Sequence, residues 1–496
     1  MLLEADAVAA YPAERHVPAR EVADAVAASG RILVVLDDDP TGTQSVTDLP
    51  VLTRWDADDF RWAFGQAVRP AAVYVLTNTR SLAPAEAAER NRQVVLAALD
   101  AARGAGVQLG FVSRSDSTLR GHFPLETDVL AESIAAQGGG AVDGVVIVPA
   151  FPDAGRVTLG GAHYMRTTPA PGSQPGVPGA GPTGAGLTPV SETEFARDAT
   201  FGFSTSYLPD YIEEKSAGRC RAADVIVLDL ATVRAGTEAI ADALEPAVHS
   251  RPVVADIATE NDFRALALGL EEAERRGKSL LYRVGPPFVR GRIGQDVREP
   301  LTAEEVYGRP GRRSDLAAGG LIVVGSHVGL TTRQLERLTA QHSAAATVEI
   351  DVEQLLDPAR AEAHLEATIG AVVRALVEGD VIVHTSRRLV KADDPAQSLE
   401  IARTVSAAVV RVVNTVLKAT PPRFVIAKGG ITSSDVAAHG LEIRRAVVRG
   451  PMLPGIVSLW EPVDGPARGI PYIVFAGNVG DDDSLAAVTR TLSATF

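Results

Sequence analysis

The sequence has a single cysteine, Cys220, among 496 residues, and aromatic residues make up only 5% of it. One cysteine allows neither an internal disulfide nor a cysteine-rich metal site, which fits a reducing compartment, so we expect a cytoplasmic protein. The sequence also lacks a run of 18 or more apolar residues, which argues against a membrane span. Near the start, Glu4, Asp6 and Glu14 stand where a signal peptide would have a basic stretch and an apolar core, so we expect none.

Basic residues are outnumbered: 48 Lys and Arg stand against 62 Asp and Glu, giving a net charge of -14. A nucleic-acid partner needs clustered Lys and Arg, which the sequence lacks, but an anionic small molecule needs only a local basic pocket. Two nucleotide-binding patterns are also missing. Without G-x-x-x-x-G-K-[ST] the chain is not a P-loop protein, and without G-x-G-x-x-G after a first strand nicotinamide chemistry is disfavoured.

Short apolar runs recur along the chain and are separated by Ala-rich segments of helical periodicity. This alternation predicts an α/β fold with mostly parallel sheets. A representative helix is expected from Pro84, a favoured first-turn residue, to about Gly104. The expected strands are 32–36, 73–76, 109–112, 145–148, 225–228, 253–255, 280–284, 321–324, 381–383, 424–427 and 472–475.

The length predicts two or three domains, and we expect two. A polar stretch rich in Gly, Pro and Arg at 307–313 reads as the linker, so the domains are placed at 1–310 and 320–496. Residues 168–189 are mostly Gly, Pro, Ala, Ser and Thr, and such a segment buries too little apolar surface to fold. We therefore expect a flexible or disordered insertion there.

The first apolar strand ends in three carboxylates and a Gly/Thr turn, Asp37-Asp38-Asp39-Pro40-Thr41-Gly42. In open parallel sheets ligands bind outside the carboxyl ends of strands, which makes this edge a candidate site. Adjacent like charges also resist joint ionisation unless a metal, a proton or a polyhydroxy ligand relieves them. The alternative is a solvated turn in which an Asp caps a helix.

Two further strand ends are rich in groups that bind sugar acids. Residues 113–122 supply two arginines, a carboxylate, four hydroxyls and an imidazole, a mixture that suits a small polyhydroxy acid. The next strand leads into the segment 149–156, which ends in Arg156, and then to His163. The structural alternatives are a hydroxyl-rich helix start and a rigid loop.

The C-terminal half has three loops in which glycine stands beside small hydroxyl or amide residues. They begin at Gly325-Ser326, at Lys428-Gly429-Gly430 and at Gly477-Asn478, each directly after an expected strand. Glycine lets backbone N–H groups approach an anion closely, and a following helix N-terminus favours negative charge. Together the loops predict one phosphate cradle, although any one of them alone is more often a tight turn.

These motifs, in this order, resemble those of the four-carbon acid sugar kinase family. Its members carry A-D-D-x-T-G-A, D-S-T-L-R-G and P-A-F-P-x-x-G-R motifs, followed by G-S, G-G-E-T-S and G-N-F-G motifs. The sequence departs from the family pattern at Thr43, Ile431 and Val479, which replace a small residue, a Glu and a Phe. The matching segments are 37–42, 116–121, 149–156, 325–326, 429–433 and 477–480, so the resemblance spans about residues 30 to 490.

The resemblance implies ATP-dependent phosphorylation of a sugar-acid hydroxyl, with Mg²⁺, in an active-site cleft between an N-terminal sugar-acid-binding domain and a C-terminal nucleotide-binding domain. Asp37 or Asp38 is then the hydroxyl-binding general base, with Asp116 as second choice. Substrate contacts fall to Ser115, Ser117, Arg120, Arg156 and His163. Nucleotide contacts fall to Ser326, Lys428, Gly429, Gly430, Ile431, Thr432, Ser433, Gly477, Asn478 and Gly480, and a metal contact to Asp481.

Two other functions stay open at this point. Asp37-x-Asp39-x-Thr41 has the nucleophile spacing of haloacid-dehalogenase phosphatases, and Asp481 to Asp483 resemble their acidic Mg²⁺ motif. The chain could also be a non-catalytic sugar-acid sensor. We expect the partners to be a small sugar acid and ATP, with no nucleic acid and no membrane, and leave a homodimer open.

Overall fold

The computed structural model describes residues 2–167, 186–308, 313–342, 346–387 and 395–494. Its contacts divide the chain into two compact units. Unit 1 comprises Met1–Asp38 and Trp55–Val297, and unit 2 comprises Asp39–Arg54 and Arg298–Phe496. Unit 2 therefore includes a segment from the N-terminal region, residues 39–54. The predicted domain limits, 1–310 and 320–496, assign that segment to the other domain.

The main sheet of unit 1 is parallel, as the alternating pattern predicts. The chain runs from β2 through β4 and β5, and the first strand β2 lies inside the sheet between β5 and β4. In spatial order the strands are β10 (Ile226–Leu228), β11 (Arg251–Ala255), β6 (Gly144–Val148), β12 (Leu280–Val284), β5 (Gln108–Arg114), β2 (Arg31–Asp37) and β4 (Ala72–Leu76).

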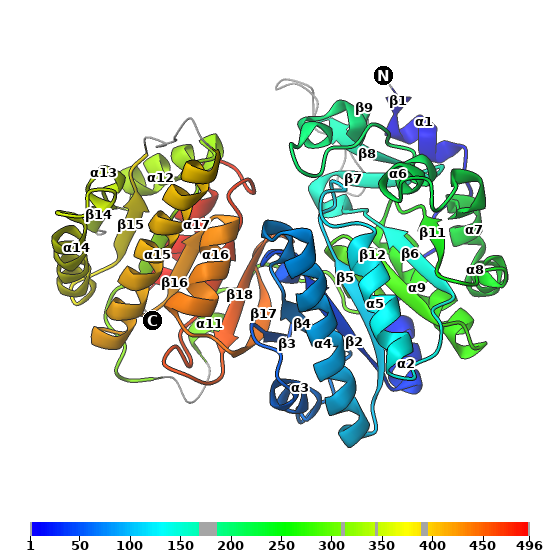
Figure 1. Cartoon of the computed structure of the whole chain (residues 1–496), viewed down its shortest axis with the longest axis horizontal. Coiled ribbons are helices and arrows are strands. Elements are labelled where there is room, and N and C mark those ends of the chain that lie inside the picture. Colours follow the sequence, from blue (N-terminus) through cyan, green and yellow to red (C-terminus); the bar gives the residue numbers. More distant parts are fainter. Residues whose placement is uncertain (1, 168–185, 309–312, 343–345, 388–394, 495–496) are drawn as a thin grey trace. The chain divides into compact units, whose positions relative to one another are not determined.

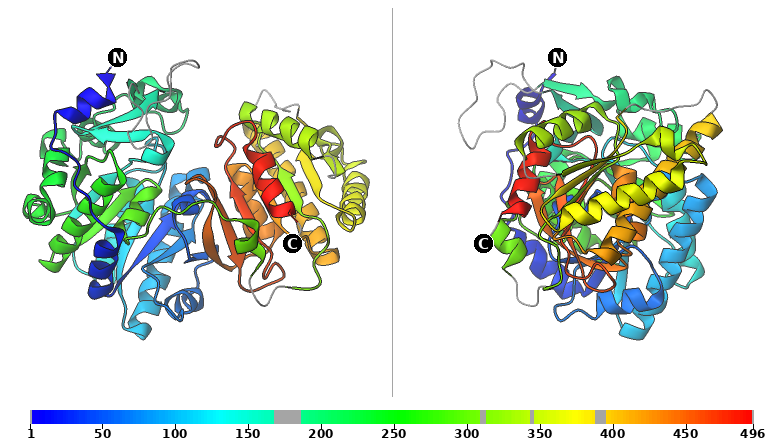
Figure 2. Two further views of the ribbon diagram at one scale, coloured as in Figure 1. Left: turned by 180° about the vertical axis from the view of Figure 1, so that it is seen from behind. Right: turned by 90° about the vertical axis from the view of Figure 1, so that its left-hand side faces the viewer.

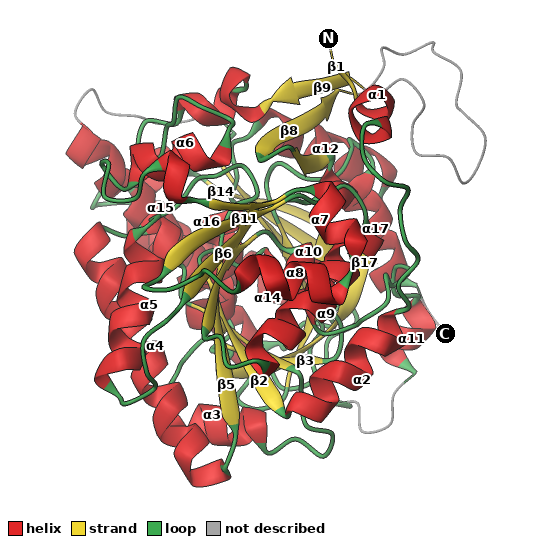
Figure 3. Cartoon of the chain, turned by 90° about the vertical axis from the view of Figure 1, so that its right-hand side faces the viewer, coloured by secondary structure: helices red, strands yellow, loops and turns green. Residues whose placement is uncertain are grey.

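Helices cover both faces of this sheet. Figure 3 shows α4 (Pro84–Ala105) and α5 (Leu125–Ala136) on one side of the strands, with α2 (Ala19–Ser29) and α9 (Glu260–Arg275) on the other. The predicted helix at 84–104 is thus α4, which begins with Pro84 and ends where Gly106 adopts a left-handed conformation, φ 61°. In sheets covered on both faces, ligands bind outside the carboxyl ends of the strands, so this edge of the unit 1 sheet is the place to look for the site.

A second, antiparallel sheet in unit 1 was not expected from the sequence. Its strands are β1 (Leu2–Leu3), β9 (Gly186–Pro189), β8 (Ala162–Thr167) and β7 (Arg156–Leu159), in that spatial order. Of the expected insertion, 168–189, residues 168–185 lie outside the described residues. The last four residues form β9, which pairs with β8, so the expectation of a flexible segment was wrong for these four.

The sheet of unit 2 is mixed. Figure 1 shows α15 (Pro395–Ala419) and α16 (Gly430–Asp435) on one face of it, and Figure 2 shows α17 (Ser484–Ser493) on the other. The strand order is β3 (Leu49–Leu52), β17 (Arg445–Leu453), β18 (Val457–Pro462), β19 (Tyr472–Phe475), β16 (Val425–Lys428), β13 (Leu321–Val324), β15 (Val381–Thr385) and β14 (Ala346–Ile350). The pairs from β3 to β19 are antiparallel and those from β19 to β14 are parallel.

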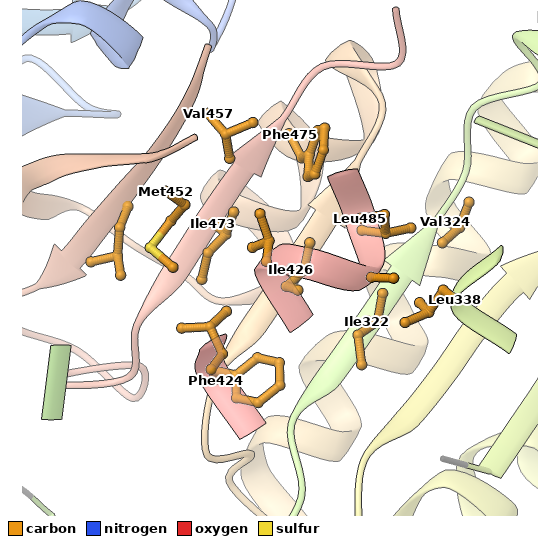
Figure 4. Close-up of a cluster of buried hydrophobic side chains, with 14 of the residues drawn as sticks. Ile322, Val324, Leu338, Phe424, Ile426, Met452, Val457, Ile473, Phe475 and Leu485 are labelled. Atoms are coloured by element: carbon orange, nitrogen blue, oxygen red, sulfur yellow. The ribbon is translucent and has the colours of Figure 1, made fainter. Parts of the chain in front are cut away.

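The core of unit 2 packs this sheet against α12 (Gly329–Gln341) and α17. Figure 4 shows Ile322, Ile426 and Ile473 from three neighbouring strands beside Leu338 and Leu485 from the two helices. Each of these side chains is buried, which contributes about 1.5–3 kcal/mol apiece. The burial holds α12 and α17 at the strand ends, where the glycine-rich loops lie. None of the described helices is long and apolar enough to cross a membrane.

Candidate functional site

The carboxyl edge of the unit 1 sheet carries a row of charged side chains. Asp37 at the end of β2 is in register with Arg114 of β5, and Arg114 is in register with Val284 of β12. The Arg114 guanidinium forms a hydrogen-bonded ion pair with Asp37 and lies 3.6 Å from the Asp38 carboxylate. All three charged side chains are almost fully buried, so each charge depends on its partners.

Arg80 holds the second carboxylate. Its Nε and Nη2 donate to the two oxygens of Asp38 over 3.0 and 2.6 Å, a two-pronged contact that fixes the plane of the carboxylate. Arg80 follows β4, whose carboxyl end lies at the same edge, and its Nη1 reaches the Asp116 carboxylate at 4.0 Å. Arg80 therefore links the first acidic motif to the second.

Asp116 organises the loop that follows β5. Its carboxylate accepts from the Thr118 amide at 3.1 Å, the Thr118 hydroxyl at 2.6 Å and the Arg120 Nε at 2.6 Å. Burial alone would raise the pKa of Asp116, but Arg80, Arg120 and Thr118 outweigh it and lower the pKa to about 2. Asp116 is therefore ionised at neutral pH and a weak proton acceptor.

Gly121 brings this loop against the acidic edge. A Cβ there would lie 2.9 Å from the Arg283 Nη2 and 3.2 Å from an Asp38 oxygen, and its φ is +119°. Only glycine fits both the space and the conformation. Arg283 is held in turn by Glu126, which accepts from its Nη1 at 2.7 Å, so a second buried ion pair supports the loop.

Arg120 and Arg156, the predicted carboxylate binders, lie beside one aromatic ring. Their guanidinium carbons lie 5.0 and 6.0 Å from the centre of Phe195. Arg120 is committed to Asp116, but the Nε of Arg156 is buried and hydrogen-bonds to no atom within the described chain. A buried unpaired guanidinium nitrogen is costly unless a ligand supplies the acceptor.

His163 lies deeper than the other predicted substrate residues. It is fully buried, with its Nδ1 3.0 Å from the Thr158 hydroxyl and its Nε2 2.8 Å from the Ser117 carbonyl. Burial lowers the pKa of His163 to about 4, so the ring is neutral. In place of the expected substrate contact, the structure shows His163 holding the Ser117 backbone. The hydroxyls of Ser115 and Ser117 make no hydrogen bond with the described residues.

In unit 2 the structure brings the three glycine-rich loops together. A Cβ on Gly429 would lie 3.2 Å from the Ser326 Cβ, and one on Gly477 would lie 2.6 Å from the Ser326 Oγ. Thr432 also lies against the first loop, since a Cβ on Gly325 would lie 2.3 Å from its hydroxyl. This close backbone packing at the ends of β13, β16 and β19 fits the predicted cradle.

Lys428 differs from the expectation that it faces a phosphate. Its side chain is fully buried, the Nζ donates to the Ala476 carbonyl at 2.6 Å, and the ammonium lies 3.8 Å from the centre of the Phe475 ring. Burial lowers the pKa of Lys428 to about 7. The residue ties β16 to the end of β19 from inside the core.

The remaining predicted nucleotide residues differ in how exposed they are. Gly430 is partly buried, Ser433 is buried with its hydroxyl bonded to Ala427, and Ile431 is 62% exposed. Asn478 and Gly480 are exposed. The exposed Asp481 accepts from the Ser484 hydroxyl at 2.7 Å and its own turn, and no described group of three or more His, Cys, Asp or Glu could hold a metal.

The two motif aspartates that a phosphatase would pair belong to different compact units. Asp37 ends β2 in unit 1, whereas Asp39 begins the unit 2 segment and accepts from the Thr41 amide at 2.9 Å. Thr43 and Ser458 are hydrogen-bonded at 2.9 Å, and the Trp460 ring nitrogen donates to Thr43 at 2.8 Å. The second half of the motif therefore anchors to unit 2.

Sequence reasoning missed Arg80, Arg283, Glu126 and Phe195. A signal existed for Arg80, because it follows an expected strand whose carboxyl end must share the edge with Asp37. For Arg283 and Glu126 there was none, because a charged residue inside a strand or helix pattern gives no indication of its partner. Phe195 lies in a short 3₁₀ helix, Glu194–Arg197, which the sequence did not predict.

Comparison with known proteins agrees with this division of sites. A family model described as a sugar-binding N-terminal domain matches residues 33–292, and one described as a nucleotide-binding C-terminal domain matches residues 321–485. A protein of Heliobacterium modesticaldum, D-erythronate kinase, is 26% identical over 433 residues, covering 83% of this chain and 85% of its own.

Two solved structures share the fold. One, from Salmonella typhimurium LT2 and provisionally described as a tRNA synthase, covers 92% of this chain and 98% of its own with a TM-score of 0.62 and 19% identity. The other, Haemophilus influenzae protein HI1011, covers 92% and 99% with a TM-score of 0.60 and 16% identity. With more than half of its length matched by the sugar-binding model and most of the rest by the nucleotide-binding model, the chain belongs to the four-carbon acid sugar kinase family.

Proposed function

We propose that this protein is an ATP-dependent kinase that phosphorylates a hydroxyl of a four-carbon sugar acid. The observation that carries the proposal is that one chain joins a sugar-binding and a nucleotide-binding domain and aligns over 83% of its length with a D-erythronate kinase. Phosphoryl transfer requires positioning and charge neutralisation rather than covalent participation by the protein. Unit 1 offers the groups for a polyhydroxy acid, and unit 2 offers the groups for an anion.

On the sugar side, Arg156 binds the substrate carboxylate. Its buried Nε has no acceptor in the described chain, and a guanidinium pairs well with a planar carboxylate. Arg120 beside it orients Asp116 and adds positive charge. The hydroxyls of Ser115 and Ser117 bind substrate hydroxyls, and His163 acts as a positioning residue by holding the Ser117 carbonyl.

Asp38 is the best-placed carboxylate to accept the proton of the attacking hydroxyl. Arg80 fixes its plane, and the second motif passes so close that a Cβ on Gly121 would lie 3.2 Å from one of its oxygens. Asp116, with a pKa of about 2, is a weak base and contributes by binding. Asp37, paired with Arg114, supports Asp38 from the strand end.

On the nucleotide side, the backbone around Ser326, Gly429 and Gly477 cradles the phosphates. A Cβ on Gly429 or Gly477 would collide with the side chain of Thr432 or Ser326, so glycine lets the loops pack closely. Glycine-rich loops of this kind present backbone N–H groups to an anion. Mg²⁺ would arrive with ATP and neutralise phosphate charge, and Asp481 could provide one carboxylate ligand, as Mg²⁺ sites of this kind need.

The test is a panel of four-carbon and related sugar acids assayed for substrate-dependent ADP release with Mg-ATP. We expect at least one acid to be turned over, and Asp38→Asn to lower kcat by about 10² or more. Asp100→Asn, the same change at an exposed ion-paired position on α4, is the matched control and should keep full activity. A panel without turnover, or an Asp38→Asn enzyme as fast as the wild type, would contradict the proposal or the assignment respectively.

A further inference from the structure

The guanidinium of Arg387, near the first glycine-rich loop of unit 2, has two nitrogens without a hydrogen-bond partner in the described chain. Arg387, which follows β15, donates from its Nη2 to the Thr332 hydroxyl on α12 at 2.7 Å. Its Nε and Nη1 are buried and hydrogen-bond to nothing in the described chain. Two of the three guanidinium nitrogens therefore have donors to spare.

His327, the residue after Ser326, belongs to the same cluster. Burial, followed by the charge of Arg387, lowers the pKa of His327, and a hydrogen bond with the Arg387 backbone opposes this. The imidazole is therefore neutral at physiological pH, and its buried Nδ1 has no hydrogen-bond partner in the described chain. The positive charge of the cluster rests on Arg387.

Three other cations near these loops, among the residues that the structure describes, are occupied. Lys428 donates to a backbone carbonyl inside the core, Arg333 pairs with Asp482 at 2.8 Å, and Arg337 faces Asp483 at 4.0 Å. Arg387, by contrast, forms no direct ion pair with a carboxylate of the described residues, and the charge of Glu336 only partly offsets the burial that lowers its pKa. A partly buried cation without a directly bound anion is retained at a cost, which a bound anion would remove.

We propose that Arg387 binds the phosphate chain of the nucleotide, with Thr332 orienting its guanidinium and His327 holding its backbone. The inference rests on the proposed function. It goes further by assigning the binding of the phosphate charge to a residue outside the glycine-rich motifs. The geometry suits it, because Thr332 holds Nη2 while the free Nε and Nη1 point to different sides of the guanidinium and can each donate to a separate phosphate oxygen. Arg387 is then the phosphate-binding cation that the sequence assigned to Lys428.

The experiment measures binding by calorimetry, without turnover, on the full chain. The probes are ATP, inorganic tripolyphosphate, which has phosphates but no base, and adenosine, which has a base but no phosphates. Arg387→Met is compared with Arg387→Lys and with Arg374→Met, the same change at an exposed position on α14 (Ala361–Leu376) of the same unit.

We expect Arg387→Met to weaken ATP and tripolyphosphate binding at least about tenfold and to leave adenosine binding unchanged. Arg387→Lys should recover only part of the loss, because a lysine is a point charge without a fork. Arg374→Met should bind like the wild type. Matching circular dichroism spectra and melting temperatures show that the variants are folded.

Two results would overturn the inference, and a third would overturn the proposed function. A wild-type chain that binds ATP and an Arg387→Met chain that binds it equally well would reject the role of Arg387 and leave the proposed kinase intact. Equal losses for ATP and adenosine would also reject it, since they would show a general disturbance of the loops. A wild-type chain that binds no ATP would reject the proposed function itself.

Discussion

The buried lysine of unit 2, Lys428, makes the stability of the folded chain depend on pH. Among the residues that the structure describes, no carboxylate forms an ion pair with the Lys428 Nζ, which contacts the Ala476 carbonyl and the face of Phe475. Burial therefore lowers its pKa to about 7, against about 10.4 in an unfolded chain. Below pH 7 both states bind the proton, and the folded state keeps the charge buried.

Replacing Lys428 by Met is expected to remove a pH dependence of stability. Because the pKa is lower in the folded state, the unfolded state binds more protons between about pH 7 and pH 9, so wild-type stability rises over that range by about 2 kcal/mol. Lys428→Met should lack this rise. Urea unfolding of both chains at the two pH values measures the difference, and parallel curves would contradict it.

At the scale of elements, the loop between β5 and α5 depends on a glycine. Gly121 adopts a φ of +119° and lies against the Arg283 guanidinium and the Asp38 carboxylate. Any side chain there must push these groups apart or strain the backbone. The geometry of the loop and that of the acidic strand end are therefore set together.

Gly121→Ala is expected to destabilise the chain by about 1–3 kcal/mol and to reduce kcat/KM for the sugar acid by about 10² or more. Denaturant unfolding and steady-state kinetics measure both. Gly104→Ala near the end of α4 is the matched control, because a Cβ there meets nothing within 4 Å and alanine favours helix. A Gly121→Ala chain as stable and active as the control would refute the argument.

The sequence predicted the elements that are buried on both faces. The apolar runs at 32–36, 109–112 and 321–324 form β2, β5 and β13, and the helix from Pro84 is α4. Parallel strands of this kind read as continuous apolar runs bounded by turns, and their carboxyl ends must share an edge. The clustering of Asp37, Asp38 and Asp116 follows from that rule.

What the sequence could not predict depends on pairing between distant segments. The first part of β17 alternates between buried and half-buried positions, and the strand contains Pro451, a pattern that many surface segments share. The partner of Asp38 is Arg80, 42 positions along the chain, and the sequence marks only the strand end that Arg80 follows, not the pairing itself. Likewise the sequence placed Lys428 in the loop, because the orientation of the last residue of a strand depends on neighbours from another strand.

At the scale of the whole molecule, the division of the chain limits how it can be cut. The predicted C-terminal domain, 320–496, omits Leu301 and Tyr307, which belong to the buried cluster of unit 2, and also omits β3, which pairs with β17. Tyr307 donates to the Leu492 carbonyl at 2.7 Å. Each omission removes core packing or strand pairing.

A fragment of residues 298–496 should therefore be more stable than one of 320–496, by several kcal/mol for two large buried side chains. Adding a peptide of residues 39–54 should stabilise it further by supplying β3. Thermal unfolding with the peptide and with a scrambled peptide of the same composition measures both effects. Equal melting temperatures for the two fragments, or no effect specific to the native peptide, would show that unit 2 is complete without these segments.

The split within the acidic motif also sets an order of events at the ribosome. Asp37 and Asp38 can join unit 1 as soon as β4 and β5 have emerged, whereas the pairing of β3 with β17 forms only when β17 is made near the end of synthesis. Domains usually fold as units during synthesis, N-terminal first. Here unit 2 has to complete its sheet with a strand that was synthesised before most of unit 1.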